Sequence, residues 1–523
     1  MDLHQINRLY HTLKHLKFTQ VYHQFKYRLV KPRRVATPWD GAFAQVDLVD
    51  LPKKQKSLSI SEDVWSFSFL NLGQSFSQDY LDWSFGDYGM LWTYNLNYFD
   101  WLHQTGMSKE QGLETLSQYY STPAEKNSII LHPYPASLRI INTAKFISKW
   151  NITEEWLYYE LVSDLKFLSG RLEYHLLANH LLENAFALYI GGLITNQSEF
   201  IQKGKKLLVR ELNEQVLNDG MHYERSPMYH LIILERLLDA LNFAKASGDE
   251  LESVLKSYAA RMTGLAMNWK DLYRIPMMQD SAYDIALKVP EALKYSESLL
   301  GEDYPCRSNQ LKESGYRKLN NRNLSLFANV GSIGPSYQPA HAHSDELSFE
   351  LFYLGTPIIV DTGISTYEKN DARFKERSSI SHNCISFKFQ NLSDVWAGFR
   401  VGKRAIVESQ SSSDFIQATC KANRVQITRN FQVVSDGLLV EDNVERNMGL
   451  PAQGCLHIHP DIDIEMLDSN NFKVSELIIS ISADSSDVWI EDYTYCKGYN
   501  NRVPSKKLVY SLKNHAKVEF RKA

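Results

Sequence analysis

Residues 219–246 read DGMHYERSPMYHLIILERLLDALNFAKA. Asp219-Gly220 is typical of a turn, and Ser226-Pro227 is typical of a helix start, with Ser226 as the cap and Pro227 in the first turn. From 228 to 246 the apolar side chains recur with the 3.6-residue period of an α-helix. The stretch therefore predicts a helix whose N-terminus is crowded with titratable side chains: Tyr223, Glu224, Arg225, Tyr229 and His230.

The same helical period dominates the sequence from about residue 87 to 300, with short Gly-, Asn- or Pro-containing loops between the segments. Such a series of helical hairpins, without a repeat of fixed length, favours an array or toroid of helix pairs. The expected helices cover 96–103, 136–150, 156–168, 175–189, 198–217, 228–246 and 251–267.

Residues 303–323 are polar, and after them short strands separated by turn residues dominate, as in an antiparallel sandwich. The expected strands cover 324–330, 347–352, 357–360, 405–409, 415–420, 425–434, 438–444, 455–459, 472–474, 477–482, 488–493 and 507–512. The predicted fold class is α+β and multidomain: an N-terminal lead (1–70), a helical domain (71–305) and antiparallel β-sandwich-like sheets (306–523). A ligand cleft is expected where the two large parts meet.

The chain has 523 residues, 57 basic and 61 acidic, with a formal charge of −4, so no overall field favours nucleic acid. Aromatic residues make up 12% of the chain, led by 29 tyrosines. Tyr and Trp join a flat apolar face to a polar edge, which suits a sugar-binding cleft. A large Tyr-rich core is the alternative explanation.

Residues 1–34 contain eight basic side chains and one acidic side chain, a net charge of +7 on a body of −11. Their apolar residues follow a helical period that ends at Pro32. A basic amphipathic helix can lie on an anionic membrane, so we expect either a peripheral membrane contact or docking on the protein's own acidic body. No secretory signal is visible. We therefore expect the protein in the cytoplasm, either free or associated with the membrane, and a periplasmic location stays open.

The five cysteines form no CxxC pair and do not indicate a disulfide framework. The sequence has no P-loop, GxGxxG fingerprint, HExxH or GxSxG motif, so we expect no organic cofactor. Asn179-His180 interrupts an apolar helix, and an amide beside an imidazole can hold a carboxylate. His343, Asp361 and His382 form a candidate metal site, since three N/O ligands suit zinc.

Taken together, several segments resemble the heparinase II/III family of polysaccharide lyases. They run in the family's order: ANHLLENAFAL (178–188), DGMHYERSPMYH (219–230), HAHSDELSFEL (341–351), GTPIIVDTG (355–363), SHN (381–383) and WAGFRVG (396–402). LWTYNLNYFDWL (91–102) and LHPYPASLRIIN (131–142) are similar to the branch found with bacterial surface-polysaccharide genes. The resemblance implies an incomplete (α/α) toroid followed by antiparallel β-sheets.

The resemblance also implies β-elimination at a uronic acid in an acidic polysaccharide. It implies that Asn179 and His180 bind the uronate carboxylate, that Tyr229 is a base or acid, and that His341 faces the cleft. Arg225 and the helix N-terminus are expected to lower the pKa of Tyr229. The family's second catalytic tyrosine would be Tyr367, the only tyrosine between Asp361 and His382.

In zinc-containing members the metal ligands would correspond to His343, Asp361 and His382, with zinc in a structural role. The expected substrate-binding residues are Tyr94, Asn95, His132, Tyr134, Arg139, Tyr223, Glu224 and Arg225. For Arg139, pairing with a sugar carboxylate competes with an internal ion pair. Two other functions stay open: a non-catalytic glycan-binding component of an assembly complex, and a glycan hydrolase that uses the same cleft.

Overall fold

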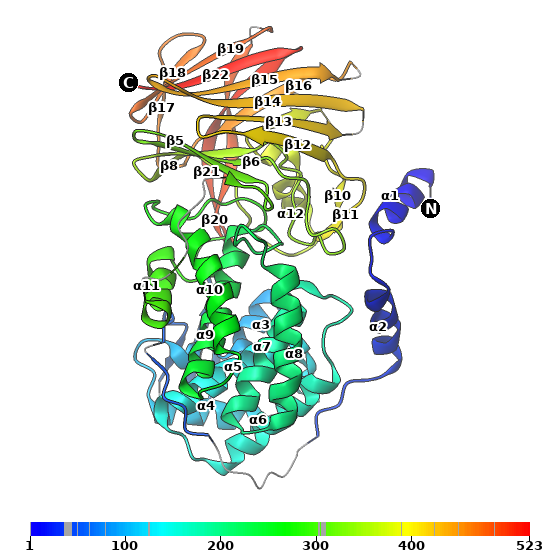
Figure 1. The fold of residues 1–523 in the computed structure, drawn as a ribbon, viewed down its shortest axis with the longest axis vertical. Helices are drawn as coiled ribbons and strands as arrows, with labels where there is room; N and C mark the ends of the chain where they lie inside the picture. The colour runs from blue at the N-terminus through cyan, green and yellow to red at the C-terminus, as the bar shows by residue number, and fades with distance from the viewer. Residues whose placement is uncertain are drawn as a thin grey trace.

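The computed structural model describes residues 2–35, 44–49, 51–61, 63–78, 80–123, 126–301, 304, 310–388, 390–422, 424–447, 449–485 and 487–523. Helices fill one half of the molecule and β-sheets the other, and two N-terminal helices lie along one side (Figure 1). The predicted order, a helical part followed by antiparallel sheets, is confirmed. Closure of the helices into a toroid stays an expectation.

The helical half is built around α7, in which every residue except His180 is buried. Helix α7 packs on α5 and α8, and α9 packs on α7, α10 and α11. The helices are α3 (Met90–Tyr98), α4 (Lys109–Ser121), α5 (Pro133–Trp150), α6 (Glu155–Gly170), α7 (Ala178–Ile194), α8 (Ser198–Gln215), α9 (Pro227–Ala246), α10 (Glu252–Ala266) and α11 (Val289–Leu300).

The predicted start of α9 is confirmed. Ser226 is the N-cap, its Oγ accepts a hydrogen bond of 3.2 Å from the Tyr229 N–H, and Pro227 is the first helical residue. Gly220 in the preceding turn has φ +89°, and a Cβ there would lie 2.4 Å from the Arg261 carbonyl oxygen. This turn and cap together place Glu224 and Tyr229 at the end of α9 that faces the β half.

Three antiparallel sheets form most of the β half. The first runs β4 (Gln310–Leu311), β5 (Tyr316–Asn321), β6 (Leu324–Asn329), β7 (Phe349–Tyr353) and β8 (Thr356–Ile359). The second runs β20 (Val488–Gly498), β21 (Asn501–Leu512), β16 (Ala452–His457) and β9 (Ile385–Phe387). Side chains from these sheets share one core with the largest sheet, through residues such as Phe349, Leu456 and Phe431.

The largest sheet has eight strands. Their order is β12 (Ile406–Ser411), β13 (Phe415–Ala422), β14 (Val425–Val434), β15 (Gly437–Arg446), β22 (His515–Lys522), β19 (Leu477–Ala483), β18 (Asn471–Val474) and β17 (Ile464–Met466). The burial of β14 alternates along its first residues, which explains why its period-2 pattern predicted its bounds correctly. Short strands β10 (Val395–Trp396) and β11 (Arg400–Val401) form a separate ribbon.

Some elements were not predicted. Helices α4 and α11 are missing from the predicted set, as are β5 and β22. A small sheet of β1 (Leu58–Ile60), β2 (Val64–Phe69) and β3 (Leu72–Ser77) packs Trp65 and Phe67 into the helical core. The predicted domain boundary at residue 70 falls in the β2–β3 turn of this sheet. None of the helices in the described part of the chain is long and apolar enough to cross a bilayer.

The contact between α7 and α8 gives a stability prediction. A Cβ on Gly204 of α8 would lie 2.6 Å from the Tyr189 backbone nitrogen and 2.8 Å from its Cα. Overpacking of this kind costs about 1–3 kcal/mol, because backbone atoms cannot move aside as a side chain can. We therefore expect Gly204→Ala to lower the free energy of unfolding by about that amount in urea titrations. Gly170→Ala is the matched control, since nothing lies within 4 Å of its added Cβ. A Gly204→Ala protein as stable as the wild type would contradict the prediction.

Candidate active site

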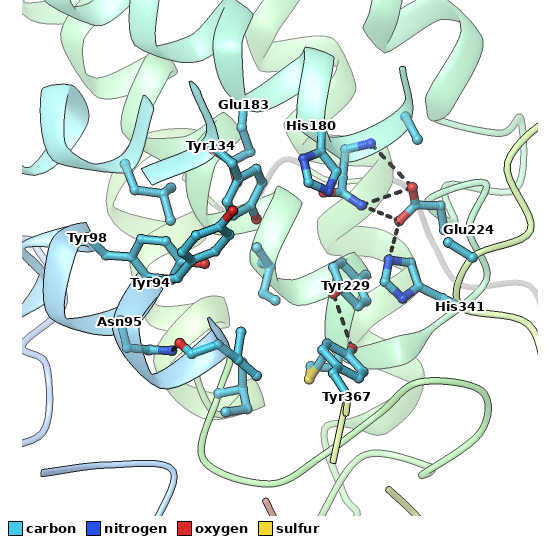
Figure 2. A pocket seen from close by; sticks show the side chains of 18 of the residues that line it. Tyr94, Asn95, Tyr98, Tyr134, His180, Glu183, Glu224, Tyr229, His341 and Tyr367 are labelled. Carbon is cyan, nitrogen blue, oxygen red and sulfur yellow. Dashed lines mark hydrogen bonds and ion pairs between the residues drawn. The ribbon is translucent and has the colours of Figure 1, made fainter. Parts of the chain in front are cut away.

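A cavity of about 460 Å³ lies where α3, α5, α7 and α9 meet loops of the β half (Figure 2). Tyr94, Tyr98 and Tyr134 lie on one side of it, and Tyr229, His341 and Tyr367 lie on the other. The predicted residues that line it are Tyr94, Asn95, Tyr134, Asn179, His180, Glu224, Tyr229, His341 and Tyr367. Residues as far apart in the sequence as Tyr94 and Tyr367 therefore meet at one site, and part of the aromatic excess does line a cavity.

Asn179 lies in the first turn of α7 and lines the cavity. Its side-chain Nδ2 donates to both carboxylate oxygens of Glu224, at 3.0 and 2.9 Å, and its backbone N–H donates to Oε1 at 3.2 Å. Leu177 and Ala178, just before it, have φ of +61° and +54°. Strained backbone of this kind persists only where the surroundings enforce it, and it is common at functional sites. The Asn179 amide is thus held ready for a carboxylate, and in this structure the carboxylate is that of Glu224.

His180 follows on the same turn and is the half-exposed residue of α7. Its Nδ1 lies 3.1 Å from Glu173 Oε1, and its ring lies 4.5 Å from the Tyr134 ring, centroid to centroid. Burial opposes a charge on the ring, but the Glu173 carboxylate outweighs it, so the pKa of His180 is raised above its usual 6.5. The ring's Nε2 makes no hydrogen bond to any described residue. His180 can therefore present a positive N–H to an anion in the cavity.

Tyr229 and Tyr367 form a hydroxyl pair across the cavity wall, with 3.2 Å between the two oxygens (Figure 2). The Tyr229 ring stacks on His341 at a centroid distance of 3.9 Å and an interplanar angle of 30°. Burial raises the pKa of Tyr229 well above 10, and burial likewise raises that of Tyr367. Both hydroxyls therefore carry their protons in the unliganded protein.

The expectation that Arg225 lowers the pKa of Tyr229 is contradicted. The Arg225 guanidinium donates to the carbonyl oxygens of Ser332 and Glu313, in β-half loops, and does not line the cavity. The pKa of Tyr229 is raised by burial, and Arg225 is not among the groups that shift it.

Asp280, in the loop after α10, is bonded by three basic side chains. His341 Nδ1 lies 2.9 Å from Oδ2, His343 Nε2 lies 2.8 Å from Oδ1, and Arg373 Nη2 donates to Oδ2 at 2.7 Å. Burial alone would raise the pKa of Asp280, but Arg373 and the two histidines hold it well below 3.8. An ionised carboxylate only accepts, so Nδ1 of His341 carries the proton. The other nitrogen, Nε2, lies 3.8 Å from Glu224 Oε2 and has its lone pair free when the ring is neutral.

The His341–His343 segment is a turn-rich loop. The two side chains still point to one side, because both reach Asp280. Sequence analysis did not find Asp280, Glu173 or Arg373. Each lies outside the motifs, and only the folded chain brings them to the histidines.

The predicted metal ligands are all buried and close together. His343 and His382 have ring centroids 5.3 Å apart, and His382 Nδ1 lies 2.7 Å from Asp361 Oδ2. His343 Nδ1 and His382 Nε2 are buried and have no hydrogen-bond partner among the residues that the structure describes. Within the described ranges, no group of three or more His, Cys, Asp or Glu side chains is arranged to hold a metal. The two orphaned nitrogens fit a cation, while Asp361 is placed as the outer partner of His382, so the zinc site stays a prediction.

Three other predicted residues do not line the cavity. Arg139 is fully buried and forms two hydrogen bonds with Asp164, at 2.7 and 3.1 Å, so the internal ion pair is the correct reading. The Tyr223 hydroxyl bonds that of Tyr337 at 2.9 Å. His132 lies behind the wall, where its Nδ1 is 2.9 Å from the Tyr94 hydroxyl oxygen.

A second polar group lines the cavity and was not predicted: Lys54, Asp100, Glu183, Glu235 and Arg236. Lys54 forms an ion pair of 2.6 Å with Glu235, and Arg236 Nε lies 3.6 Å from Glu183. Both carboxyl oxygens of Glu183 are buried and make no hydrogen bond within the described part of the chain. Burial raises the pKa of Glu183 to about 7, with Arg236 opposing and the neighbouring acids adding to the rise.

Two family models match this chain. The heparinase II/III N-terminus matches residues 87–299, and the heparinase II/III-like C-terminal model matches residues 305–521. The chain belongs to the heparinase II/III family. The predicted resemblance is therefore confirmed, and the family match spans both halves of the cavity.

Among curated proteins of this family, the heparin-sulfate lyase of Bacteroides thetaiotaomicron is 25% identical over 297 residues, 47% of this chain and 42% of that protein. The heparin-sulfate lyase of Pedobacter heparinus is 25% identical over 217 residues, 36% of this chain and 32% of that protein. The chain thus spans less than half the length of either relative.

Solved structures show the same fold. A crystal structure of heparinase III matches with a TM-score of 0.66 at 16% identity, covering 86% of this chain and 80% of that one. The heparan sulfate lyase HepC from Pedobacter heparinus matches with a TM-score of 0.57 at 17% identity, covering 88% of this chain and 81% of that one.

Glu183 gives a pH-dependent prediction. Its pKa is about 7 in the folded protein against 4.5 when exposed, so stability falls as the pH rises through this window, because only the unfolded chain ionises freely. Glu183→Gln removes that loss. We expect the stability of the variant relative to wild type to rise by about 2–3 kcal/mol between pH 5 and pH 8 in urea unfolding.

The exposed Glu476 supplies the control, since Glu476→Gln should show no such rise. A Glu183→Gln difference that is the same at both pH values would show that this carboxyl is already ionised in the folded protein.

Proposed function

We propose that this chain is a polysaccharide lyase that cleaves a uronic-acid-containing glycan by β-elimination. The observation that carries the proposal is the stacked pair of Tyr229 and His341. The Tyr229 hydroxyl lies beside that of Tyr367, and Nδ1 of His341 is hydrogen-bonded to Asp280. The family relatives named as heparin-sulfate lyases support a glycosaminoglycan-like substrate. We further propose, from motifs 91–102 and 131–142, that the polymer belongs to bacterial surface-polysaccharide production.

β-Elimination at a uronic acid needs three catalytic groups. A base must take the C5 proton, a positive or hydrogen-bonding group must stabilise the adjacent carboxylate, and an acid must protonate the leaving O4. The electron pair of the C5–H bond becomes the C4–C5 double bond as the C4–O4 bond breaks. The cavity contains a side chain suited to each of these three roles.

His180 and Asn179 are suited to the substrate carboxylate. The raised pKa of His180 favours its charged form, and its Nε2 makes no bond to a described residue. Asn179 has an amide already aimed at a carboxylate. Contact of Asn179 with substrate requires Glu224 to turn away or to share the amide. The substrate carboxylate would then replace Glu224 beside His341.

His341 is suited to be the base, and Tyr229 the acid. Asp280 fixes the proton of His341 on Nδ1, which leaves Nε2 to accept the C5 proton. Tyr229 is protonated because burial raises its pKa, so it has a proton for O4 and cannot serve as a resting base. The Tyr367 hydroxyl, 3.2 Å from that of Tyr229, stabilises the tyrosinate as it forms. Zinc, if held by His343 and His382, would brace the loop that carries His341.

The lyase proposal predicts a chromophore. Incubation with heparan sulfate or another uronate polymer should give 4,5-unsaturated products, detected by ultraviolet absorbance. Tyr229→Phe should lower kcat by about 10²–10⁴-fold with little change in KM, because it removes the proton donor and leaves the cavity shape.

Tyr283→Phe is the matched control, because Tyr283 also shares a hydroxyl–hydroxyl bond, at 2.8 Å with Tyr495, but does not line the cavity. Full activity of Tyr229→Phe would refute its role. Cleavage products without the chromophore would point to a hydrolase, and polymer binding without any turnover would point to a glycan-binding protein.

The metal proposal rests on the two orphaned nitrogens of His343 and His382. Elemental analysis of the purified protein after incubation with zinc and desalting should find about one zinc per chain. His343→Ala and His382→Ala should each lose it, whereas His459→Ala, a histidine elsewhere in the β half, should retain it. A zinc-free wild-type protein after this treatment would contradict the proposal.

A further inference from the structure

The N-terminal residues 2–35, called here the strap, run along the side of the molecule beside both halves (Figure 1). The strap contains α1 (Leu3–Leu13) and α2 (Phe18–Leu29). At its β end, Arg8 donates to both carboxylate oxygens of Asp394, at 2.9 and 2.7 Å. At its helical end, Arg34 Nε donates to Asp164 at 2.6 Å. The strap is therefore anchored at both ends.

Several polar side chains of the strap point inward and bond to the body. Gln20 is buried, and its Nε2 donates to the carbonyl oxygens of Leu176 and Tyr337. Tyr27 donates its hydroxyl proton to the Leu172 carbonyl oxygen. In α1, Thr12 accepts from Trp396 Nε1 at 3.2 Å. A surface helix of a globular protein does the opposite, with its polar side chains outward.

The apolar side chains of the strap face solvent instead. Phe18 is 82% exposed and Leu29 is 85% exposed. The exposed apolar residues of α2, at positions 18, 21, 22, 25 and 29, have the helical spacing that puts them on one face. Those of α1, at positions 6, 10 and 13, likewise share one face. The exposed large apolar side chains of the strap are Ile6, Tyr10, Leu13, Phe18, Val21, Tyr22, Phe25, Leu29, Val30 and Val35. An exposed apolar face of this kind on each of the two helices marks an interaction site.

Basic side chains flank this face. At 100° per residue, Lys26 and Arg28 lie on opposite sides of the α2 apolar stripe. These two, with Lys14, Lys31 and Arg33, are exposed and form no ion pair with a described carboxylate. Arg8, Lys17 and Arg34 are paired with Asp394, Glu214 and Glu160 of the body. Docking on the acidic body therefore uses three of the charges, and the others stay available.

We propose that the outer face of the strap docks on an anionic lipid surface. Aliphatic and aromatic side chains bordered by lysine and arginine suit the boundary between acyl chains and negative headgroups. A second copy of this face is a poor partner, because each strap presents the unpaired cations Lys14, Lys26, Arg28, Lys31 and Arg33 and the two faces would repel. An acidic polysaccharide satisfies the charges but leaves Ile6, Leu13 and Leu29 exposed to water.

The test is co-sedimentation of the full chain with vesicles of phosphatidylcholine alone or mixed with phosphatidylglycerol. We expect binding to the mixed vesicles, at least tenfold weaker binding to the neutral ones, and loss of binding in high salt. The variant Phe18→Ser/Phe25→Ser/Leu29→Ser should lose binding. The variant Lys26→Gln/Arg28→Gln/Lys31→Gln should bind the mixed vesicles about a hundredfold more weakly, at about fivefold per charge.

The control is Tyr273→Ser/Leu354→Ser, which removes exposed apolar side chains away from the strap and should bind like wild type. All the substituted strap residues are exposed, so folding, checked by thermal melting, should be unchanged. Equal binding to neutral vesicles, or no binding to either kind, would overturn the proposal. A wild-type dimer that the Phe18→Ser/Phe25→Ser/Leu29→Ser variant abolishes would also overturn it, in favour of a second copy. Activity on soluble polymer does not enter this test, so it succeeds or fails independently of the lyase proposal.

Discussion

The rest of the site depends on the bonds that the Asp280 carboxylate makes with His341, His343 and Arg373. It lies in the loop between α10 and α11, and it is fully buried. His341 and His343 reach it from the loop between β6 and β7, and Arg373 reaches it from α12 (Asp371–Glu376). One ionised group thus joins three segments from both halves. A buried carboxylate is tolerated only when it is paired and hydrogen-bonded, so its partners are held as tightly as it is.

The consequence for chemistry is a fixed proton arrangement. Because Asp280 can only accept, the proton of His341 stays on Nδ1 and the opposite nitrogen faces the cavity. The same constraint on His343 places its proton on Nε2 and leaves its buried Nδ1 with a lone pair, which burial keeps neutral by lowering the ring's pKa to about 4. The proposed base, His341, and the candidate metal-binding residue His343 therefore obtain their tautomers from one carboxylate. This links the bracing of the loop to the tautomer of the histidine that it carries.

Local sequence signals predicted what local forces determine. Ser226-Pro227 indicated the start of α9, and the alternation along 425–434 indicated β14, because capping and side-chain period act within a few residues. The family motifs then placed Asn179, His180, Tyr229, His341 and Tyr367 at one cavity. No local signal separates Arg139, which forms a buried ion pair with Asp164, from an arginine that faces a ligand. Asp280 and Glu173 have no pattern around them, since their importance comes only from which histidines the fold brings near.

The strap shows the same limit in another form. Its 3.6-residue period correctly indicates an apolar face, yet a period does not say which face meets the body. The answer comes from the partners: Leu172, Leu176 and Tyr337 offer carbonyl oxygens and Asp394 offers a carboxylate, and all of these attract polar side chains. The body thus takes the polar face, and the apolar face is left to solvent. Because the polar face of the strap is bonded to the body, its apolar face is available to contact something else. The unpaired lysines and arginines beside that face favour a negatively charged partner.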